Sequence, residues 1–428
     1  MSNWKKTCAV LLTAILILAM SVSALADGEP TLDNHAVTTT NEVVRIVKEI
    51  TVYNPENATV NEPTATYTYT IAAGSADKII KDGQDPQVQA PTIAGVTTGI
   101  KVASQTSPTA ASGTSVTLTY SPTADATLNA SAAGTANEKW VEFDFSGVNF
   151  GAPGVYRYEI TEEAAAYSSN GVVEGTTGHN RYLDVYVKAA ADQTVTDEAD
   201  KWEVYGYALS TSDDGIDANT DPKQTNKTTG FVSHTDGTED KTADQYYTFN
   251  LVVEKTVTND PYIKSTLHKF PFTITLTNTT VTANVLPIMT LSDNASQTAL
   301  SAAAIAGTWT PSIADGASVT YVGIPAGTTI SIKETNDVVG TTYLVTITGA
   351  DTNPDAANVY YNNDSSEAKV TSGATAGAAA TANKTVSFDN NLQLISPTGV
   401  ILRVAPYVLM LAVGVVLLVI ARRKRATR

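Results

Sequence analysis

The chain has almost no cysteine, and this bounds its chemistry. The single cysteine among 428 residues is Cys8, which lies in an N-terminal stretch that reads as a cleaved signal peptide. A mature chain without cysteine has no disulfide, no cysteine-ligated metal and no thiol nucleophile. An exported protein that bears mechanical stress would therefore need a different covalent staple.

Histidines and basic residues are also scarce. The four histidines are His35, His179, His234 and His268. Their spacing matches no metal-binding motif, so no zinc site and no cofactor are expected. No phosphate-binding glycine loop or Gly-x-Ser-x-Gly turn is present, so nothing indicates an enzyme acting on an external substrate. The formal charge of −16 argues against nucleic-acid binding, which requires basic patches.

The N-terminus predicts export. Within residues 1–26, Lys5 and Lys6 precede an apolar run from Ala9 to Met20, and Ala24-Leu25-Ala26 offers a small-x-small cleavage site. A short charged region, an apolar run and small residues in this order are typical of a secretory signal peptide. The mature protein is therefore expected to be secreted.

The C-terminus, residues 394–428, predicts an anchor. An apolar stretch from Val400 to Ile420 is interrupted only by Arg403 and is followed by the basic run Arg422–Arg425. Twenty or so apolar residues can cross a bilayer as a helix, and the basic tail should stay in the cytoplasm. Pro397, Thr398 and Gly399 stand just before this stretch and resemble a sortase cell-wall sorting signal, although the usual leucine before the proline is absent. The resemblance implies cleavage between Thr398 and Gly399 and attachment to the cell wall.

Between the termini, short runs of alternating apolar and polar residues predict strands, and turn residues separate them. No convincing helix is expected. The pattern predicts an all-β fold of two tandem immunoglobulin-like β-sandwich domains. The first spans 41–235 with an insertion at about 74–138, and the second spans 244–391.

One predicted strand, Leu251–Thr258, carries a lysine in the middle of its apolar face, because Leu251, Val253 and Lys255 share that face. A buried ammonium must reach solvent, find a partner or lose its charge. Either Lys255 extends to solvent from a sheet edge or it meets partners inside. Glu334 and Asn390 each lie on the apolar side of a later strand and are candidate partners.

Lysine, glutamate and asparagine together form a reaction centre. A buried lysine tends towards the nucleophilic neutral amine, and a buried glutamate towards the neutral acid. The amine can attack the asparagine carboxamide while the acid polarises its oxygen. Ammonia then leaves and an isopeptide bond remains, helped by the high effective concentration that the fold supplies.

Three motifs occur in a recognisable order: Lys255, then Pro325-Ala326-Gly327 leading to Glu334, then Phe388-Asp389-Asn390. This order resembles the streptococcal pilin isopeptide-linkage domain over roughly residues 250 to 391. The resemblance implies that Lys255 bonds to Asn390 and that Glu334 catalyses the reaction.

The first domain repeats this pattern only in part. Lys48 lies on the apolar face of a predicted strand, and Glu162 ends a strand that resembles the family's glutamate strand. The expected Phe-x-Asn motif reads Phe231-Val232-Ser233, and serine has no carbonyl group that an amine could attack. The first bond therefore lacks an electrophile, unless Asn226 or Asp236 substitutes through a different register.

The resemblance implies a pilus subunit that sortase polymerises through Thr398. The acceptor would be a lysine near the end of the first domain, Lys227 or Lys223. The partners would be sortase, neighbouring subunits and peptidoglycan. The alternative is a monomeric wall-anchored adhesin, with residues 74–138 binding a host or glycan ligand.

Overall fold

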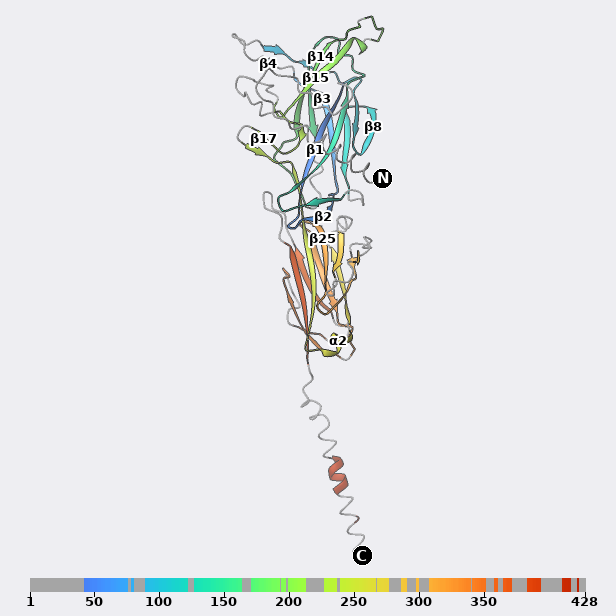
Figure 1. Cartoon of the computed structure of the whole chain (residues 1–428), viewed down its shortest axis with the longest axis vertical. Coiled ribbons are helices and arrows are strands. Elements are labelled where there is room, and N and C mark those ends of the chain that lie inside the picture. Colours follow the sequence, from blue (N-terminus) through green and yellow to red (C-terminus); the bar gives the residue numbers. More distant parts are fainter. Residues whose placement is uncertain are drawn as a thin grey trace, which may run out of the picture.

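The chain is all-β, as the sequence predicts. The computed structural model describes residues 42–75, 78–80, 89–121, 127–163, 171–192, 194–197, 199–212, 227–236, 239–266, 268–276, 286–290, 298–299, 308–339, 341–351, 358–360, 365–371, 383–393, 410–416 and 422. Two groups of buried apolar side chains form two separate cores, and we name the parts of the chain around them the first and the second lobe. Figure 1 shows the lobes one after the other along the long axis.

The strands before the longest one are β1 (Val43–Tyr53), β2 (Ala58–Asn61), β3 (Ala65–Ala73), β4 (Lys78–Ile80), β5 (Gln89–Pro91), β6 (Ile93–Ala94), β7 (Lys101–Ser104), β8 (Ser107–Ser112), β9 (Ser115–Tyr120), β10 (Thr127–Ala130), β11 (Thr135–Asp144), β12 (Gly154–Glu162), β13 (Val172–Val173), β14 (Asn180–Ala189), β15 (Trp202–Ser210), β16 (Gly230–Phe231), β17 (His234–Asp236) and β18 (Glu239–Lys241). The remaining strands are β19 (Asp244–Thr258), β20 (Lys269–Leu276), β21 (Leu286–Thr290), β22 (Thr298–Ala299), β23 (Thr308–Trp309), β24 (Ser312–Ala314), β25 (Ser318–Pro325), β26 (Thr329–Thr335), β27 (Tyr343–Thr348), β28 (Asn358–Tyr360), β29 (Ser365–Thr371) and β30 (Lys384–Leu392). The described helical segments are the 3-10 helix η2 (Ala199–Lys201), α2 (Pro261–Thr266), residues 410–416 and residue 422.

The first lobe is built from two sheets. One has the order β1-β11-β7-β8, and the other has the order β15-β14-β12-β3-β9. Val44 and Ile46 alternate with less buried neighbours along β1, and Tyr67 and Tyr69 do so along β3. These four side chains belong to one buried core, because period-two alternation gives each strand a single apolar face.

The second lobe is built in the same way. The order β21-β25-β19-β30-β27 forms one sheet, and β23-β20-β26-β29 forms the other. Leu251 and Val253 on β19, Ile330 and Ile332 on β26 and Phe388 on β30 are fully buried in its core.

Strand β19 connects the two lobes. Its first residues, Asp244–Tyr247, run parallel to the end of β1, and Leu251–Thr258 run parallel to β30. The pairing with β25 shifts between Phe249 and Leu251, so the strand is irregular at this point. Tyr246 packs in the first core and Phe249 in the second. A single 15-residue strand therefore takes part in both lobes.

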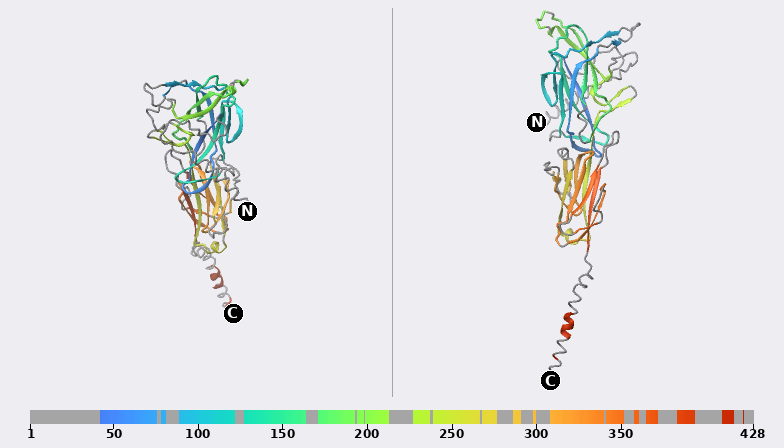
Figure 2. Two further views of the ribbon diagram at one scale, coloured as in Figure 1. Left: turned by 45° about the horizontal axis from the view of Figure 1, so that its top comes forward. Right: turned by 180° about the vertical axis from the view of Figure 1, so that it is seen from behind.

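Buried amides hold the junction between the lobes. Asn54 and Asn250 exchange two hydrogen bonds, with donor–acceptor distances of 3.0 and 3.1 Å. Asn54 Nδ2 also donates to Thr248 Oγ1 at 2.9 Å, and the Gly323 amide donates to Asn250 Oδ1 at 3.1 Å. β1, β19 and β25 are thereby joined where the lobes meet, end to end in both views of Figure 2.

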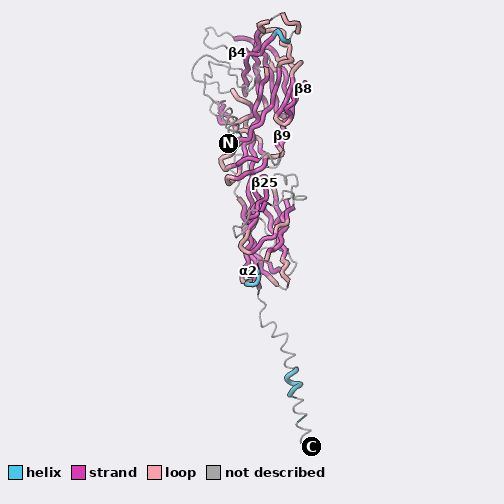
Figure 3. The backbone as a smooth tube through the Cα atoms, turned by 45° about the vertical axis from the view of Figure 1, so that its right-hand side comes forward, coloured by secondary structure: helices cyan, strands magenta, loops and turns pink. Residues whose placement is uncertain are grey.

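The expectation that no helix interrupts the strands is wrong at α2. This short helix lies at the far end of the second lobe in Figure 3. Asp260 Oδ1 accepts hydrogen bonds from the amides of Tyr262 and Ile263, both at 3.1 Å. Pro261 occupies the first helical position, where its missing N–H is not needed. An N-cap aspartate followed by proline is a start signal that an assignment based on strand alternation overlooks.

Several predicted segments lie partly or wholly outside the described residues. They are the signal peptide, the sorting motif and most of Val400–Ile420. In the part of the chain that the structure describes, no helix is long and apolar enough to cross a membrane. The stretch 74–138 contains β4 to β10 and the start of β11.

Candidate functional site

Lys255, Glu334 and Asn390 meet inside the second lobe. Lys255 lies opposite Phe388 in the parallel pairing of β19 with β30, and Asn390 lies two residues further along β30. Glu334 comes from β26 in the facing sheet. Lys255 Nζ lies 3.5 Å from Glu334 Oε1, and Asn390 Nδ2 donates to the same oxygen at 2.7 Å.

The surroundings of this trio favour uncharged groups. Each of the three residues is at most 2% exposed. Lys255 Nζ lies 4.8 Å from the ring centroid of Phe270 and donates to two backbone carbonyl oxygens. Burial lowers the pKa of Lys255 and raises the pKa of Glu334. Both shifts favour a neutral amine beside a neutral acid.

This arrangement suits an attack of the amine on the amide. Glu334 Oε2 and Asn390 Oδ1 are buried and have no hydrogen-bond partner among the described residues. A half-turn of the Asn390 amide would let a protonated Glu334 donate to Oδ1, which is the atom that gains negative charge when the amine attacks. The Asn390 nitrogen would then leave as ammonia.

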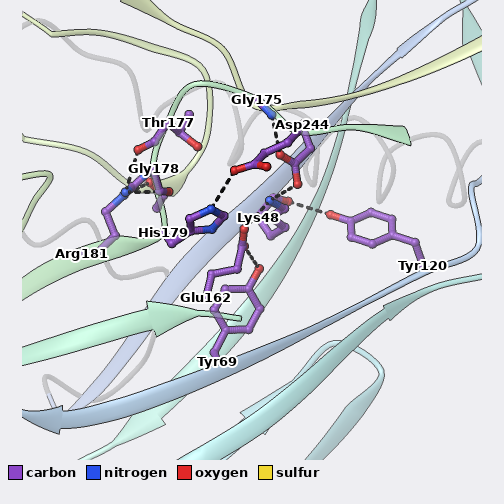
Figure 4. Close-up of polar contacts among 12 residues, drawn as sticks. Lys48, Tyr69, Tyr120, Glu162, Gly175, Thr177, Gly178, His179, Arg181 and Asp244 are labelled. Carbon is purple, nitrogen blue, oxygen red and sulfur yellow. Dashed lines mark hydrogen bonds and ion pairs between the residues drawn. The ribbon is translucent and has the colours of Figure 1, made fainter. Parts of the chain in front are cut away.

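A second trio lies inside the first lobe. Lys48 on β1 has its Nζ 3.0 Å from Glu162 Oε1, at the end of β12, and 2.7 Å from Asp244 Oδ2, at the start of β19. The three side chains are 1–2% exposed. Figure 4 shows Glu162 and Asp244 converging on the lysine amine. Lys48 and Glu162 are residues that the sequence predicts for this site, and Asp244 is not among them.

The backbone register explains why Asp244 was missed. Phe231 on β16 lies opposite Lys48, and Asp244 lies opposite Ile50. Between these two points the chain leaves the sheet and forms the hairpin of β17 and β18. The expected Phe-x-Asn motif is therefore split, and its last position is filled by a residue on the far side of the hairpin.

The second lobe has the same register without the interruption. Phe388 lies opposite Lys255, and Asn390 lies opposite Val257, two residues after the lysine. Asp244 and Asn390 therefore occupy equivalent places beside their lysines. A carboxyl group stands in the first lobe where a carboxamide stands in the second.

Ser233 has a different position from the one that the sequence suggests. Its amide and hydroxyl both donate to the Glu49 carboxylate, and its hydroxyl accepts a hydrogen bond from the Ala243 amide at 3.0 Å. These contacts close the base of the hairpin just before Asp244. Of the two alternatives, Asp236 lies in β17 on this hairpin, and Asn226 lies outside the described residues.

The aromatic residues around the two trios also correspond. Tyr69 lies opposite Glu162, as Phe272 lies opposite Glu334. Lys48 Nζ lies 4.3 Å from the ring centroid of Tyr67, two residues earlier on β3, where the second lobe has Phe270. The two sites therefore have the same arrangement of residues, with two tyrosines in the first site and two phenylalanines at the matching positions of the second.

The other candidate residues are separate from both trios. Lys227 forms an isolated β-bridge with Ser210 at the end of β15 and is partly exposed. Lys223 and the motif Pro397, Thr398 and Gly399 lie outside the described residues. Among the described side chains, no cluster of three or more histidine, cysteine or acidic residues could hold a metal ion.

Comparison with known proteins gives limited matches. Residues 249–387 match a domain family described as "Domain of unknown function (DUF7601)". A search of curated proteins found no match. The chain is similar to the major pilin of Streptococcus pyogenes, with 20% identity and a TM-score of 0.40, over 81% of this chain and 98% of the pilin.

Two further solved structures show weaker or comparable similarity. The major pilin T3.2 of Streptococcus pyogenes is 16% identical with a TM-score of 0.41, over 82% of this chain and 99% of that one. A bacterial adhesin from Mobiluncus mulieris, described as containing intramolecular disulfide, isopeptide and ester cross-links, is 11% identical with a TM-score of 0.22, over 82% and 100%. The segment that matches the domain family contains Lys255 and Glu334 and ends just before Asn390.

Proposed function

We propose that the protein is a structural subunit of a cell-surface pilus, with each lobe locked by an isopeptide bond that the fold itself catalyses. The observation that carries this proposal is the buried contact of Lys255, Glu334 and Asn390. A buried lysine and glutamate are expensive for a fold unless they react or serve a further purpose. A bond between Lys255 and Asn390 removes the buried amine and releases ammonia.

The first lobe would use the same reaction with a different leaving group. Lys48 would attack the side-chain carboxyl carbon of Asp244 while Glu162 relays protons. One water would be lost and an amide would remain. Lys48 and Asp244 are 196 residues apart in sequence. If an isopeptide bond restricts the unfolded chain as a disulfide does, a loop of this length corresponds to about 5 kcal/mol of stabilisation.

The positions of the bonds suit a protein under tension. Each bond would join two adjacent parallel strands, β1 to β19 in the first lobe and β19 to β30 in the second. A pull on the C-terminal end would then pass from β30 through β19 to β1 by covalent bonds. Without these covalent bonds, the hydrogen bonds between the strands would carry the same load, and the strands would separate one after another.

Export and assembly rest on the two ends of the chain. The signal peptide would direct secretion, and sortase would cleave between Thr398 and Gly399. The acyl group of Thr398 would then pass to a lysine of the next subunit, for which Lys227 is the candidate among the described residues. Attachment of the last subunit to peptidoglycan would leave the pilus on the cell wall.

Intact mass under denaturing conditions tests the bonds. Recombinant residues 27–398 should be lighter than the sequence mass by one water and one ammonia. The Glu334→Ala variant should keep the water deficit and lose the ammonia deficit, and Glu162→Ala should do the reverse. If the wild type had the full sequence mass, with neither water nor ammonia lost, the cross-linking part of the proposal would be contradicted.

Wall extracts test the assembly. A pilus subunit should run as a ladder of covalent polymers in a denaturing gel, and the Thr398→Ala variant should abolish the ladder. A single wall-bound band in the wild type would contradict the pilus proposal and favour the monomeric adhesin.

A further inference from the structure

The two proposed bonds start from electrophiles of unequal reactivity. An ionised carboxyl group carries negative charge, and attack by an amine adds to that charge. It therefore resists the attack more than a neutral carboxamide does. The first site therefore needs groups that stabilise an oxyanion, and two polar groups lie beside its Asp244 carboxyl, whereas Asn390 Oδ1 has no hydrogen-bond partner among the described residues.

The first donor is the backbone amide of Gly175. It donates to Asp244 Oδ1 at 2.9 Å, while Lys48 Nζ lies 2.7 Å from the other oxygen, Oδ2. The two carboxyl oxygens of Asp244 thus have different partners. Figure 4 shows the Gly175 amide aimed at the carboxyl group of Asp244.

Only glycine fits at position 175. A Cβ atom there would lie 2.2 Å from the Thr242 carbonyl oxygen and 2.4 Å from the backbone of Ala243. This close approach is held by the Thr176 amide, which donates to the Thr242 carbonyl at 2.8 Å. The missing side chain lets the Gly175 N–H reach Asp244.

The second donor is the hydroxyl of Tyr67. Its ring lies under the Lys48 amine, and its buried hydroxyl lies beside the Asp244 carboxyl. Burial is the largest cause that raises the pKa of Tyr67, followed by the charges of Asp244 and Glu162. The phenol therefore keeps its proton and remains a donor. In the second lobe, Phe270 occupies this place without a hydroxyl.

We propose that the Gly175 amide and the Tyr67 hydroxyl form an oxyanion-binding pair that adapts the first site to an aspartate electrophile. This inference rests on the proposed function. The Lys48 nitrogen bonds to Cγ of Asp244 as the bond from Cγ to Oδ2 breaks. Oδ1 becomes the amide oxygen and stays on the Gly175 N–H. Glu162 takes two protons in turn from the Lys48 ammonium, one before and one after the nitrogen bonds to Cγ, and passes both to Oδ2, which leaves as water.

The Tyr67→Phe variant tests the pair, because it removes one oxygen atom and keeps the ring under Lys48. The full-length precursor is synthesised in a cell-free system, and aliquots are quenched in acid, digested and analysed by mass. The Lys48–Asp244 peptide should lose water about 100-fold more slowly than in the wild type, as expected when one oxyanion donor is removed. Ammonia loss at Lys255–Asn390 in the same molecules should keep its rate, which shows that the chain has folded.

Tyr120→Phe is the matched control. Its hydroxyl is buried in the same lobe but donates at 2.9 Å to the Lys48 backbone carbonyl, an atom that takes no part in the proposed reaction. Equal slowing in both variants would assign the effect to packing and overturn the proposal, as would wild-type speed in Tyr67→Phe. In an Asp244→Asn background, Tyr67→Phe should have a smaller effect, and an undiminished effect would also overturn it.

A second variant addresses the backbone donor. Gly175→Ala should slow water loss at least as strongly as Tyr67→Phe, since the added methyl displaces the amide from Asp244. Unchanged water loss in Gly175→Ala would overturn the role of this amide. Absence of water loss in the wild type would instead overturn the first bond of the proposed function, and the ammonia loss would still report separately on the second.

Discussion

Asp244 and Asn390 occupy the same register position, each beside the residue that follows its lysine by two places. Asn390 reaches this place directly after Phe388 on one continuous strand. Asp244 reaches it after a hairpin has separated it from Phe231. The equivalence predicts how the first site responds to substitution.

Changing Asp244 to asparagine should alter the leaving group and leave the bond. The Asp244→Asn variant presents a carboxamide to Lys48, as Asn390 does to Lys255. Its intact mass should therefore fall short of the sequence mass by two ammonia, in place of one ammonia and one water. Asp244→Ala should form no first bond. A persistent water loss in Asp244→Ala would show that another carboxyl group, such as that of Asp236, is the electrophile.

Losing the second bond should destabilise the second lobe strongly. In the Glu334→Gln variant the catalytic acid is absent but the side-chain shape is kept. We expect the free energy of unfolding to fall by about 5 kcal/mol, which is the loop-closure contribution of a cross-link of this span. Calorimetry of wild type and variant measures the difference, with absence of the ammonia loss confirmed by mass. Equal stabilities would mean that the bond contributes no stability.

The same variant should acquire a pH dependence that the wild type lacks. Unbonded Lys255 remains buried, and burial holds its pKa below the ordinary value of 10.5. The unfolded chain then binds more protons than the folded one, so stability rises with pH and levels off above the unfolded value. The thermal midpoint of Glu334→Gln should therefore increase from about pH 7 to about pH 10, relative to wild type. If the thermal midpoints of the two proteins changed in parallel with pH, a buried free amine in the variant would be contradicted.

The amide pair at the junction should stiffen the molecule. Asn250→Ala leaves Asn54 and the Gly323 amide without their buried acceptor, and an unsatisfied buried group costs about 1–3 kcal/mol. We expect a lower thermal midpoint and a broader distribution of lobe orientations, measured by calorimetry and small-angle X-ray scattering. Thr59→Ala, which removes an exposed hydroxyl of the first lobe, serves as the control. An unchanged scattering profile in Asn250→Ala would show that strand pairing alone fixes the junction.

Polymer assembly should depend on one lysine. Lys227→Arg keeps the positive charge but cannot serve as an amine acceptor for a sorted threonine. The ladder in wall extracts should collapse to the monomer band in this variant, while both mass deficits persist. Lys188→Arg, on the partly exposed end of β14, is the matched control. A normal ladder in Lys227→Arg would move the acceptor elsewhere, with Lys223 the next candidate.

Much of the second lobe could be predicted from the sequence because its strands alternate regularly. Period two places Lys255, Glu334 and Asn390 on inward faces, and the structure brings these three side chains together. The strands β21 to β24, β28 and β29 were not predicted. All of them except the seven-residue β29 have two to five residues, which give too few repeats for a period.

The first site was harder to predict for two physical reasons. A hairpin separates Phe231 from Asp244, so no short motif contains both. The inward face of β19 also changes near Asn250, where Asp244 and Tyr246 give way to Leu251 and Val253. Alternation read backwards from Lys255 therefore turns Asp244 outwards, and its position becomes visible only when β1 and β19 are paired.

Strand β19 would also decide what a protease could do to the protein once both proposed bonds have formed. With Lys48 bonded to Asp244 and Lys255 to Asn390, a backbone cut inside either loop leaves both halves joined in one covalent piece. Cleavage separates the lobes only between Asp244 and Lys255. Those residues are mostly buried and hydrogen-bonded to β1, β13, β25 and β30. The stretch whose cutting would divide the molecule is therefore one that a protease can hardly reach.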